Sequence, residues 1–398
     1  MQPSRRGTPD FLLLLLTFLI VGFGLVMVFS ASSAIAITSK EYGNNAFYVV
    51  KKQAIFAVLG TIGMFFLMNV PMAKLRLLLK PLFIVILILL ALVPFIGYEV
   101  NGARSWFRIA GFSIQPSEFA KLAVILYLAG LIDKKGDRVK EFRRGLVPSV
   151  IIVGIVAFLI MLQPDFGSMV ILVLCASLVI IVGGANMKHI LLASGAVAVI
   201  GCIGALIYVF SSETLGYRMD RISCYINPWS DSQGSCYQIV QSMYAFGHGE
   251  LTGAGIGQSI QKLHYLPEAH NDFIFAIIGE ELGFIGTVVF LLFYLAFIWR
   301  GLLVALRSTD TFGNLVGIGI VGLIGVQAFI NMGGVTGAIP MTGVTLPFIS
   351  SGGSSLLVMM CSIGILLSLS REYNKPDKQE KSDKPDKPER NRRQASRT

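Results

Sequence analysis

The sequence predicts an all-α polytopic membrane protein with ten transmembrane helices. Of its 398 residues, 54% are hydrophobic and only 14% are charged, and the mean hydropathy is +0.70. A soluble domain usually has about one quarter charged residues. Apolar runs of about 20 residues, each long enough to cross the hydrocarbon core of a bilayer, recur along the whole chain.

Ten apolar runs are predicted to span the membrane. The first follows Arg5 and Arg6, and we expect it to be retained as a helix because it is long for a signal peptide and many spans follow it. A large polar loop, residues 211–271, separates the seventh span from the eighth. The expected spans are residues 11–30, 53–70, 80–97, 116–132, 147–163, 166–183, 189–210, 273–298, 313–332 and 345–369.

The distribution of Lys and Arg predicts the orientation of these spans. The loops on the side of the N-terminus carry 14 Lys and Arg residues before the tail is counted, and the loops on the opposite side carry 8. Cytoplasmic loops are the ones enriched in positive charge. Both termini are therefore expected in the cytoplasm, including the N-terminal segment 1–10, and the loop 211–271 is expected outside.

The segment after the last span, residues 371–398, is predicted to be a disordered basic cytoplasmic tail. It contains 10 Lys and Arg residues against 6 Asp and Glu residues, and such a composition cannot bury a core. It either serves as a solvated topology anchor or contacts anionic lipid or a cytoplasmic partner. Nucleic acid is not an expected partner, because no basic fold or aromatic platform accompanies the charge.

Two of the five cysteines differ from the others in their setting. Cys224 and Cys236 lie twelve positions apart in the outer loop, where an oxidising exterior would let them form a disulfide. Cys175, Cys202 and Cys361 lie in apolar spans and are expected to be packing residues. Because no Cys and His residues have the spacing of a zinc site, the sequence does not indicate one.

The first polar cluster on the outer side precedes the fourth span and contains Arg104 and Trp106. Glu118 and Lys121, three positions apart, share a helix face and can form an ion pair. An unpaired Lys121 would be costly at that depth in the bilayer. The cluster is either a structural ion pair at a helix end or a cationic cleft for an anionic headgroup, with Arg104 as the best candidate ligand.

Two further clusters have both structural and functional interpretations. Asp165, between two spans with almost no loop, is expected to cap the next helix, with direct substrate contact as the alternative. Residues 331–355 interrupt an apolar stretch with glycines, prolines and hydroxyls, including Ser354. Such a segment either lines a cavity or allows close helix packing.

The most informative residue is Asp272, at the junction of the long outer loop and the eighth span. Either Asn271 or Asp272 would serve as the N-cap of that span, and chemistry is the alternative for Asp272. The adjacent carboxylates Glu280 and Glu281 lie deeper in the span and need partners. At least one is expected to pair with Lys121 or with an arginine of the bundle. Residues 234–249 are predicted to form a short helix on the membrane surface.

Four blocks of this sequence resemble the FtsW/RodA/SpoVE (SEDS) family. The stretch Asn331 to Ser355 matches the family signature, which ends in Ser-x-Gly-Gly-Ser-Ser. Residues 101–121, 163–167 and 267–283 match other family blocks in the same order. The resemblance covers nearly the whole chain except the tail and is closest to the FtsW/SpoVE branch, although the Cys224 and Cys236 pair departs from the usual family pattern.

The resemblance implies a peptidoglycan glycosyltransferase that polymerises lipid II at the outer face of the bacterial cytoplasmic membrane, for synthesis of the septal wall in cell division or of the spore cortex wall. It implies that Asp272 is the general base and that Arg104, Lys121 or a divalent cation such as Mg or Mn offsets the charge of the departing pyrophosphate. Trp106 is expected to position a sugar or lipid chain. Glu118, Lys262 and Ser354 complete the expected substrate-binding set.

Two other functions remain open at this stage. A lipid II flippase would use Glu280, Glu281 and Lys121 as a polar pathway, although the sequence shows no clear inverted repeat of broken helices. A non-catalytic scaffold would activate a class B penicillin-binding protein. The expected partners are lipid II, a class B penicillin-binding protein transpeptidase, other membrane proteins of the division or elongation complex, and membrane lipids; no tightly bound cofactor is expected.

Overall fold

The computed structural model describes residues 7–100, 103–109, 111–186, 188–189 and 223–374. Within these ranges nine of the ten predicted spans are helices, and the predicted span 189–210 lies almost entirely outside them. The long helices are α1 Phe11–Thr38, α2 Tyr48–Met68, α3 Met72–Ile96, α4 Pro116–Lys135, α5 Val147–Met161, α6 Phe166–Val182, α10 Ile274–Leu306, α11 Thr311–Val335 and α12 Gly353–Tyr373.

Length and apolar composition qualify seven helical segments of the described chain as membrane spans, among them α1, α2 and α3. The helix α6 is apolar but has only 17 residues. The helix α4 carries the acidic Glu118 in its first turn and the basic Lys134 and Lys135 in its last turn. The chain is therefore a predominantly helical, multi-pass membrane protein.

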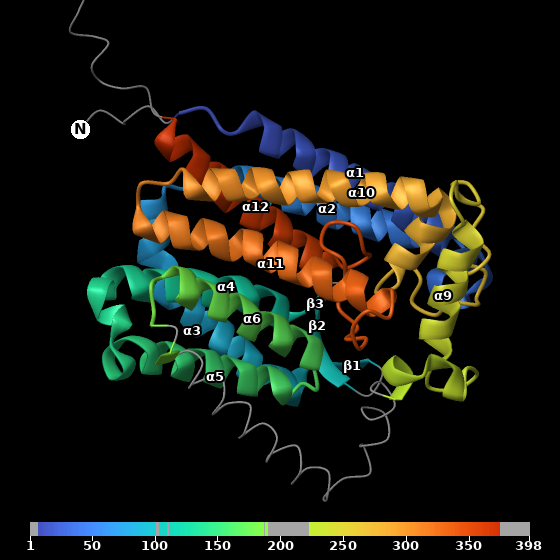
Figure 1. The fold of residues 1–398 in the computed structure, drawn as a ribbon, viewed down its shortest axis with the longest axis horizontal. Coiled ribbons are helices and arrows are strands. Elements are labelled where there is room, and N and C mark those ends of the chain that lie inside the picture. Colours follow the sequence, from blue (N-terminus) through green and yellow to red (C-terminus); the bar gives the residue numbers. More distant parts are fainter. Residues whose placement is uncertain (1–6, 101–102, 110, 187, 190–222, 375–398) are drawn as a thin grey trace, which may run out of the picture.

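The helices form a bundle whose centre is α12 and α11 (Figure 1). In α12, 83% of the most apolar window is buried within the protein, and in α11 the share is 72%, whereas α1, α2, α3 and α10 bury 22–39%. The outer helices instead expose large apolar side chains such as Phe66, Leu77 and Phe95. Such residues suit contact with lipid chains, which are as apolar as the side chains themselves.

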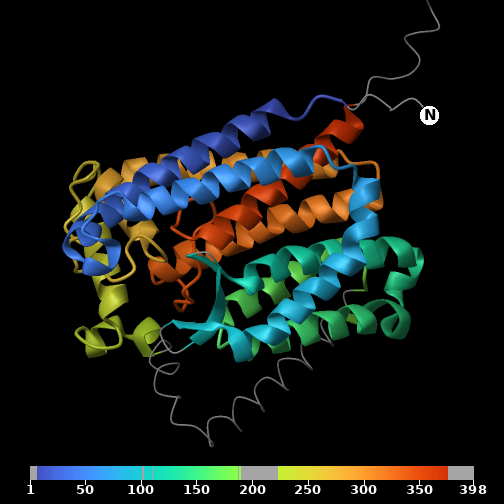
Figure 2. The same cartoon turned by 180° about the vertical axis from the view of Figure 1, so that it is seen from behind.

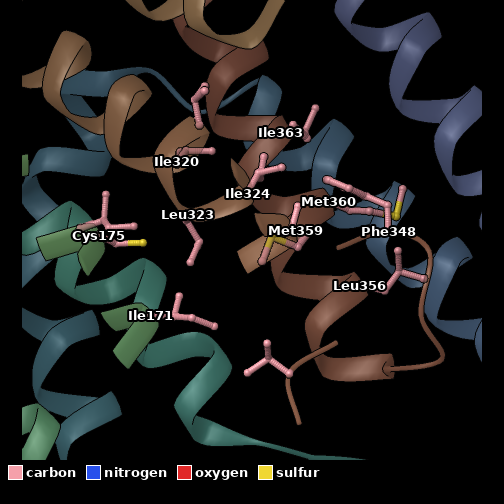
Figure 3. Packing of buried hydrophobic residues seen from close by; sticks show 14 of the residues in the cluster. Ile171, Cys175, Ile320, Leu323, Ile324, Phe348, Leu356, Met359, Met360 and Ile363 are labelled. Atoms are coloured by element: carbon pink, nitrogen blue, oxygen red, sulfur yellow. The ribbon is translucent and has the colours of Figure 1, made fainter. Parts of the chain in front are cut away.

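Small residues let the central helices approach closely. A Cβ atom added at Gly364 of α12 would lie 2.5 Å from the backbone oxygen of Met64 in α2, and one added at Gly60 would lie 2.6 Å from the sulfur of Met360. Figure 3 shows Ile320, Leu323 and Ile324 of α11 packed with residues of α6 and α12 in the surrounding apolar core. Van der Waals packing of this kind holds membrane helices together.

Both described ends of the chain lie at one end of the bundle, here called the terminal end (Figures 1 and 2). Asp10 caps α1 by accepting a hydrogen bond from the amide of Leu13, and it also forms an ion pair with Arg300 of α10, with 2.6 Å between the charged atoms. The amide of Gly7 donates to the carbonyl of Arg371 at 3.1 Å. Residues 371–373 thus continue α12 and Asn374 is its C-cap, whereas residues 375–398 of the predicted tail lie outside the described residues.

The opposite end, here called the sheet end, carries a small antiparallel sheet that the all-α prediction did not include. Its strands run in the order β1 Tyr98–Val100, β2 Ala103–Ile109 and β3 Phe112–Ile114. The β2–β3 hairpin pairs Phe107 with Ile114 and Ile109 with Phe112. Strands of three and seven residues are too short to give a clear periodic pattern, so the segment is read from sequence only as a polar loop.

The loop before α10, predicted as residues 211–271, also contributes a helix to the sheet end. The helix α9, Tyr237–Gly249, crosses the ends of the other helices (Figure 1). It buries Ile239, Val240 and Ala245, and the hydroxyl of Ser242 donates to the carbonyl of Val335 at 2.7 Å. The predicted short helix in residues 234–249 is therefore present and packs on the bundle. Short 3-10 and π segments complete the chain at η1 Lys40–Tyr42, η2 Gly136–Lys140, η3 Phe142–Leu146 and η4 Pro228–Asp231.

Candidate functional site

Asp272 is half-buried in the turn that leads into α10 at the sheet end. The amides of Asn271 and Phe273 both donate to the carbonyl of Glu268, at 2.9 and 3.3 Å, so residues 268–273 form a compact turn. The N-cap of α10 is Phe273, not Asn271 or Asp272 as predicted. The prediction was wrong by one or two residues because this turn, and not a polar cap, fixes the start of the helix.

A single side chain ties the backbone of Asp272 to the segment after α11. The Nδ2 atom of Asn331 donates to the carbonyl of Asp272 and to the carbonyl of Val344, both at 2.7 Å. Asp272 also lines a small pocket with Asn331 and residues 341–344. Asp272 therefore lies beside residues 331–355, here called the glycine-rich segment. This segment lines a cavity, which agrees with one of its two predicted interpretations.

His270, two residues before Asp272, is a buried part of the same turn. Its carbonyl accepts a hydrogen bond from the amide of Ser351 at 2.9 Å, and its ring meets that of Tyr42 edge to face at a centroid distance of 6.5 Å. The Nδ1 atom is buried and has no hydrogen-bond partner among the described residues. Burial lowers the pKa of His270, and the nearby charge of Glu268 opposes that effect.

Lys121 and Glu118 form a buried ion pair inside α4, with the pairing expected from their spacing. The Nζ atom of Lys121 donates to Glu118 at 2.7 Å and to the side-chain oxygen of Gln327 in α11 at 2.9 Å. The Nε2 atom of Gln327 in turn donates to the carbonyl of Thr345 at 3.1 Å. One lysine thus links α4, α11 and the glycine-rich segment, and its side chain is fully buried.

Asp165 and Ser354 join neighbouring elements near this ion pair. Asp165 caps α6 by accepting from the amide of Ser168 at 3.0 Å, as predicted, and also accepts from the side chains of Gln115 and Ser117. The hydroxyl of Ser354 accepts from the amide of Gln115 at 3.0 Å and donates to the carbonyl of Ser113 at 3.2 Å. In the structure Ser354 therefore connects α12 to the sheet.

Arg104 and Trp106 lie on β2 at the surface of the sheet end. The guanidinium of Arg104 forms an ion pair with Glu99 at 3.1 Å, and both side chains are more than half exposed. Trp106 is half-buried opposite Tyr98 in the β1–β2 pairing. An exposed pair of this kind contributes little to stability, so Glu99 can give up Arg104 to an anionic ligand at small cost.

The structure pairs Glu280 and Glu281 with groups of the loop before α10, which corrects the expectation that one of them pairs with Lys121 or an arginine. Glu281 accepts from Lys262 Nζ at 2.9 Å. Glu280 lies 2.9 Å from the Nδ1 atom of His248 and accepts from the amide of Ile260 at 2.8 Å. The correction has a physical cause: the loop folds into the bundle, which sequence spacing alone cannot reveal.

Lys262 was expected to bind substrate, but it is only 5% exposed. Its Nζ atom lies in a buried group with Glu281 and with the hydroxyl of Ser30 in α1, at 3.1 Å. Sequence analysis missed Ser30 and Gln327. Each is a polar residue inside an apolar span, which is the signal that could have drawn attention to them.

A disulfide joins Cys224 and Cys236 at the sheet end. Beside it lies a cavity lined by Cys224, by Ile239 and Met243 of α9, and by Ile339 and Met341 of the glycine-rich segment. This cavity shares Gly334 and Met341 with the pocket of Asp272. The loop and the glycine-rich segment therefore form adjoining walls near the carboxylate.

Comparison with protein families and curated proteins places this architecture among known membrane proteins. Residues 10–375 match the family model of FtsW, RodA and SpoVE, described as cell cycle proteins. The chain is 44% identical over 370 residues to stage V sporulation protein E of Bacillus subtilis, covering 92% of this chain and 98% of that protein. It is 42% identical over 371 residues to the probable peptidoglycan glycosyltransferase FtsW of Trichlorobacter lovleyi, covering 93% and 95%.

Solved structures share the fold as well. A chain from a structure titled as a peptidoglycan synthase complex that coordinates polymerization and crosslinking superposes with a TM-score of 0.74 at 28% identity, over 92% of this chain and 98% of that chain. The crystal structure of the rod shape determining protein RodA of Thermus thermophilus superposes with a TM-score of 0.66 at 26% identity, over 92% and 97%.

Proposed function

We propose that this chain, which belongs to the FtsW/RodA/SpoVE family of cell cycle proteins, is a peptidoglycan glycosyltransferase that polymerises lipid II. The assignment as a glycosyltransferase rests on relatives that carry the name peptidoglycan glycosyltransferase. The observation that supports a catalytic site is the placement of Asp272, half-buried on a rigid turn beside the glycine-rich segment. Relatives named for sporulation and for FtsW both match closely, so septal and spore cortex synthesis are both compatible with the chain.

In the proposed reaction Asp272 acts as the general base. The 4-hydroxyl of the acceptor's N-acetylglucosamine loses its proton to the carboxylate as its oxygen attacks the anomeric carbon of the donor's N-acetylmuramic acid. The bond from that carbon to the pyrophosphate breaks, and undecaprenyl pyrophosphate leaves with the electron pair. Asn331 fixes the backbone of Asp272 through a hydrogen bond to its carbonyl. This contact restricts the position of the carboxylate relative to a bound acceptor.

The departing pyrophosphate needs positive charge, and Arg104 is the better candidate to supply it. The side chain of Arg104 is 54% exposed, whereas that of Lys121 is fully buried and bound to Glu118. We assign Lys121 and Glu118 the role of holding α4 and α11 in register beneath the site. Trp106, on the same strand as Arg104, is a candidate to contact a sugar ring or the lipid chain.

A divalent ion fits less well on the protein's own residues. The described part of the chain contains no group of three or more His, Cys, Asp and Glu side chains that could hold one. If Mg or Mn takes part, the pyrophosphate itself would have to supply ligands.

We propose that the sheet end faces the outside of the cytoplasmic membrane and that both termini are cytoplasmic. The excess of Lys and Arg in the loops of the terminal end supports this orientation. The similarity to a chain of a peptidoglycan synthase complex supports a class B penicillin-binding protein as partner, within a larger division or elongation assembly. Lipid II would then approach from the outer leaflet, with its tails among the membrane helices.

The test is polymerisation of lipid II by the purified chain, alone and with its transpeptidase partner. Wild-type protein is expected to produce glycan strands, and Asp272→Asn is expected to lose at least 100-fold in rate, within the range for a general base. The control is Asp231→Asn in the same loop, whose carboxylate accepts hydrogen bonds from Ser235 and Gly234, both within four residues of it in the sequence; it is expected to keep the wild-type rate. A folded Asp272→Asn protein with the wild-type rate would refute the base assignment.

The same assay separates the enzyme from the flippase and the scaffold. Absence of glycan strands from wild-type protein, even with the partner present, would support one of the other two. The structure favours the enzyme over the flippase in one respect. Glu280 accepts a hydrogen bond from the amide of Ile260, and Glu281 accepts one from Lys262. Polar groups that are bonded within the protein suit a fixed support better than a pathway for a headgroup.

A further inference from the structure

The helix α10 is broken nine residues after it begins. Gly283 has φ 64° and ψ −171°, which is not helical. In an unbroken helix the amides of Phe284 and Ile285 would donate to the carbonyls four residues earlier. Here they donate instead to the carbonyls of Glu250 and Leu251, at 2.9 and 3.0 Å.

The loop after α9 fills the break on both sides. The carbonyls of Glu280 and Glu281, which the break leaves without helical partners, accept from the amides of Ala254 and Gly255 at 3.0 Å each. The loop thus replaces the missing helical bonds on the two faces of the break. The segment Ile274–Leu282 is consequently a short helix of its own, joined to the rest of α10 through another part of the chain.

Side-chain bonds hold this short helix in place at its deeper end. Glu281 accepts from Lys262 Nζ at 2.9 Å and from the hydroxyl of Ser30 at 2.6 Å. Lys262 belongs to the loop and Ser30 to α1, so the three residues join three separate elements. All three side chains are buried, each residue being at most 5% exposed, and a buried charge group of this kind is sensitive to the loss of any member.

Asp272 lies two residues before the opposite end of the short helix. Residues 274–281 are all buried, and a helical segment moves as a rigid unit. Glu281 lies nine residues after Asp272, or roughly 13 Å along the helix axis. One short, buried helical segment therefore connects Glu281, which contacts α1 and the loop, with the turn that contains Asp272.

We propose that Lys262, Glu281 and Ser30 are positioning residues for the glycosyl transfer, which hold the short helix and, through it, the carboxylate of Asp272. The proposal rests on the proposed function, in which Asp272 is the base. It also accounts for Lys262, whose burial removes it from direct contact with substrate. A misplacement of about 1 Å at a reacting group, caused from a distance, can lower a rate by about 100-fold.

The test compares the double variant Lys262→Met/Glu281→Gln with wild type in the lipid II polymerisation assay. Removing both charges together avoids leaving one of them buried alone. The expected result is a kcat lower by about 10-fold to 100-fold with KM within twofold, because substrate contacts are retained while the base is displaced. Lys262→Arg, which keeps the charge, is expected to stay within about fivefold of the wild-type kcat.

The matched control lies on the other side of the break. Arg300→Met removes the ion pair with Asp10 at the terminal end of the same helix. It is expected to lower the melting temperature and leave kcat within twofold. A double variant that is folded and retains the wild-type kcat would overturn the proposal, as would an equal loss of kcat in Arg300→Met.

Hydrogen exchange tests the positioning without any activity. In the double variant the amides of residues 274–282 are expected to exchange at least tenfold faster, with α11 unchanged; equal protection in the two proteins would overturn the proposal. If the double variant does not fold, Ser30→Ala keeps both charges and is expected to lower kcat severalfold, and an unchanged kcat would overturn the proposal. A wild-type protein that makes no glycan would instead refute the proposed function, and the exchange experiment would still decide the positioning.

Discussion

Replacement of Gly283 by alanine tests whether the break in α10 is a fixed part of the fold. The residue has φ 64° and ψ −171°, a region of backbone conformation that is essentially restricted to glycine. An added Cβ atom would lie 2.2 Å from the amide nitrogen of Gly253 and 2.8 Å from the carbonyl oxygen of Gly249. Both obstacles are backbone atoms, so no side-chain rotation can remove them.

The magnitude follows from these two effects. Backbone strain at such a site costs about 1–3 kcal/mol, and forcing extra volume into a packed site costs about 1–3 kcal/mol more. We therefore expect Gly283→Ala to lower the free energy of unfolding by about 2–6 kcal/mol. The substitution would also weaken the attachment of the loop, because the hydrogen bonds across the break require residues 249–255 to lie close to Gly283.

Thermal unfolding of the purified protein in one detergent provides the assay, with Gly22→Ala in α1 as the control. An added Cβ at Gly22 meets no atom within 4 Å, and alanine favours a helix over glycine by about 1 kcal/mol. Gly283→Ala is expected to melt several degrees below wild type, and Gly22→Ala at or slightly above it. Equal melting temperatures for Gly283→Ala and wild type would refute the reasoning.

Two further predictions concern buried charges. Lys121→Met is expected to destabilise the protein by about 3–5 kcal/mol because it leaves Glu118 buried and unpaired. The double variant Lys121→Met/Glu118→Met is expected to recover most of that loss. Thermal unfolding of both single variants and the double variant measures the coupling energy, and additive effects of the two substitutions would contradict the pairing. His270 has its pKa lowered from 6.5 by burial, so its neutral form stabilises the folded state above about pH 6.5 and that contribution is lost as the pH falls through the folded-state pKa. The melting temperature of wild type should therefore fall more steeply from pH 7.5 to pH 5.5 than that of His270→Asn, and parallel curves would contradict the prediction.

The sequence predicted the helices well because each span needs a long apolar run, which local composition reports directly. It also predicted the Lys121 and Glu118 pair, since the two residues share a helix face. The sheet was missed because its strands are short and mixed in polarity. Asp272 was found from its place at a loop–helix junction and from its family block.

The contacts between distant elements were beyond sequence reasoning. Glu281 was assigned the wrong kind of partner because Lys262 reaches it only through a loop that folds into the bundle. Ser30 is one hydroxyl in an apolar helix, and nothing near it in sequence indicates a charged neighbour. The break at Gly283 is equally hidden, because a glycine in an apolar helix is common in membrane proteins, and only the approach of residues 249–255 reveals its conformation.

The central position of α12 has a consequence for how the protein is made. Its most apolar window is 83% buried within the protein, yet it follows all the other described helices in chain order. Until it inserts, α2 and α11 lack their central neighbour, and faces shaped for close helix contact, such as that at Gly60, meet lipid instead. The centre of the bundle is therefore packed only after α12 has inserted, so the helices before it in the chain are synthesised without the neighbour that they later enclose.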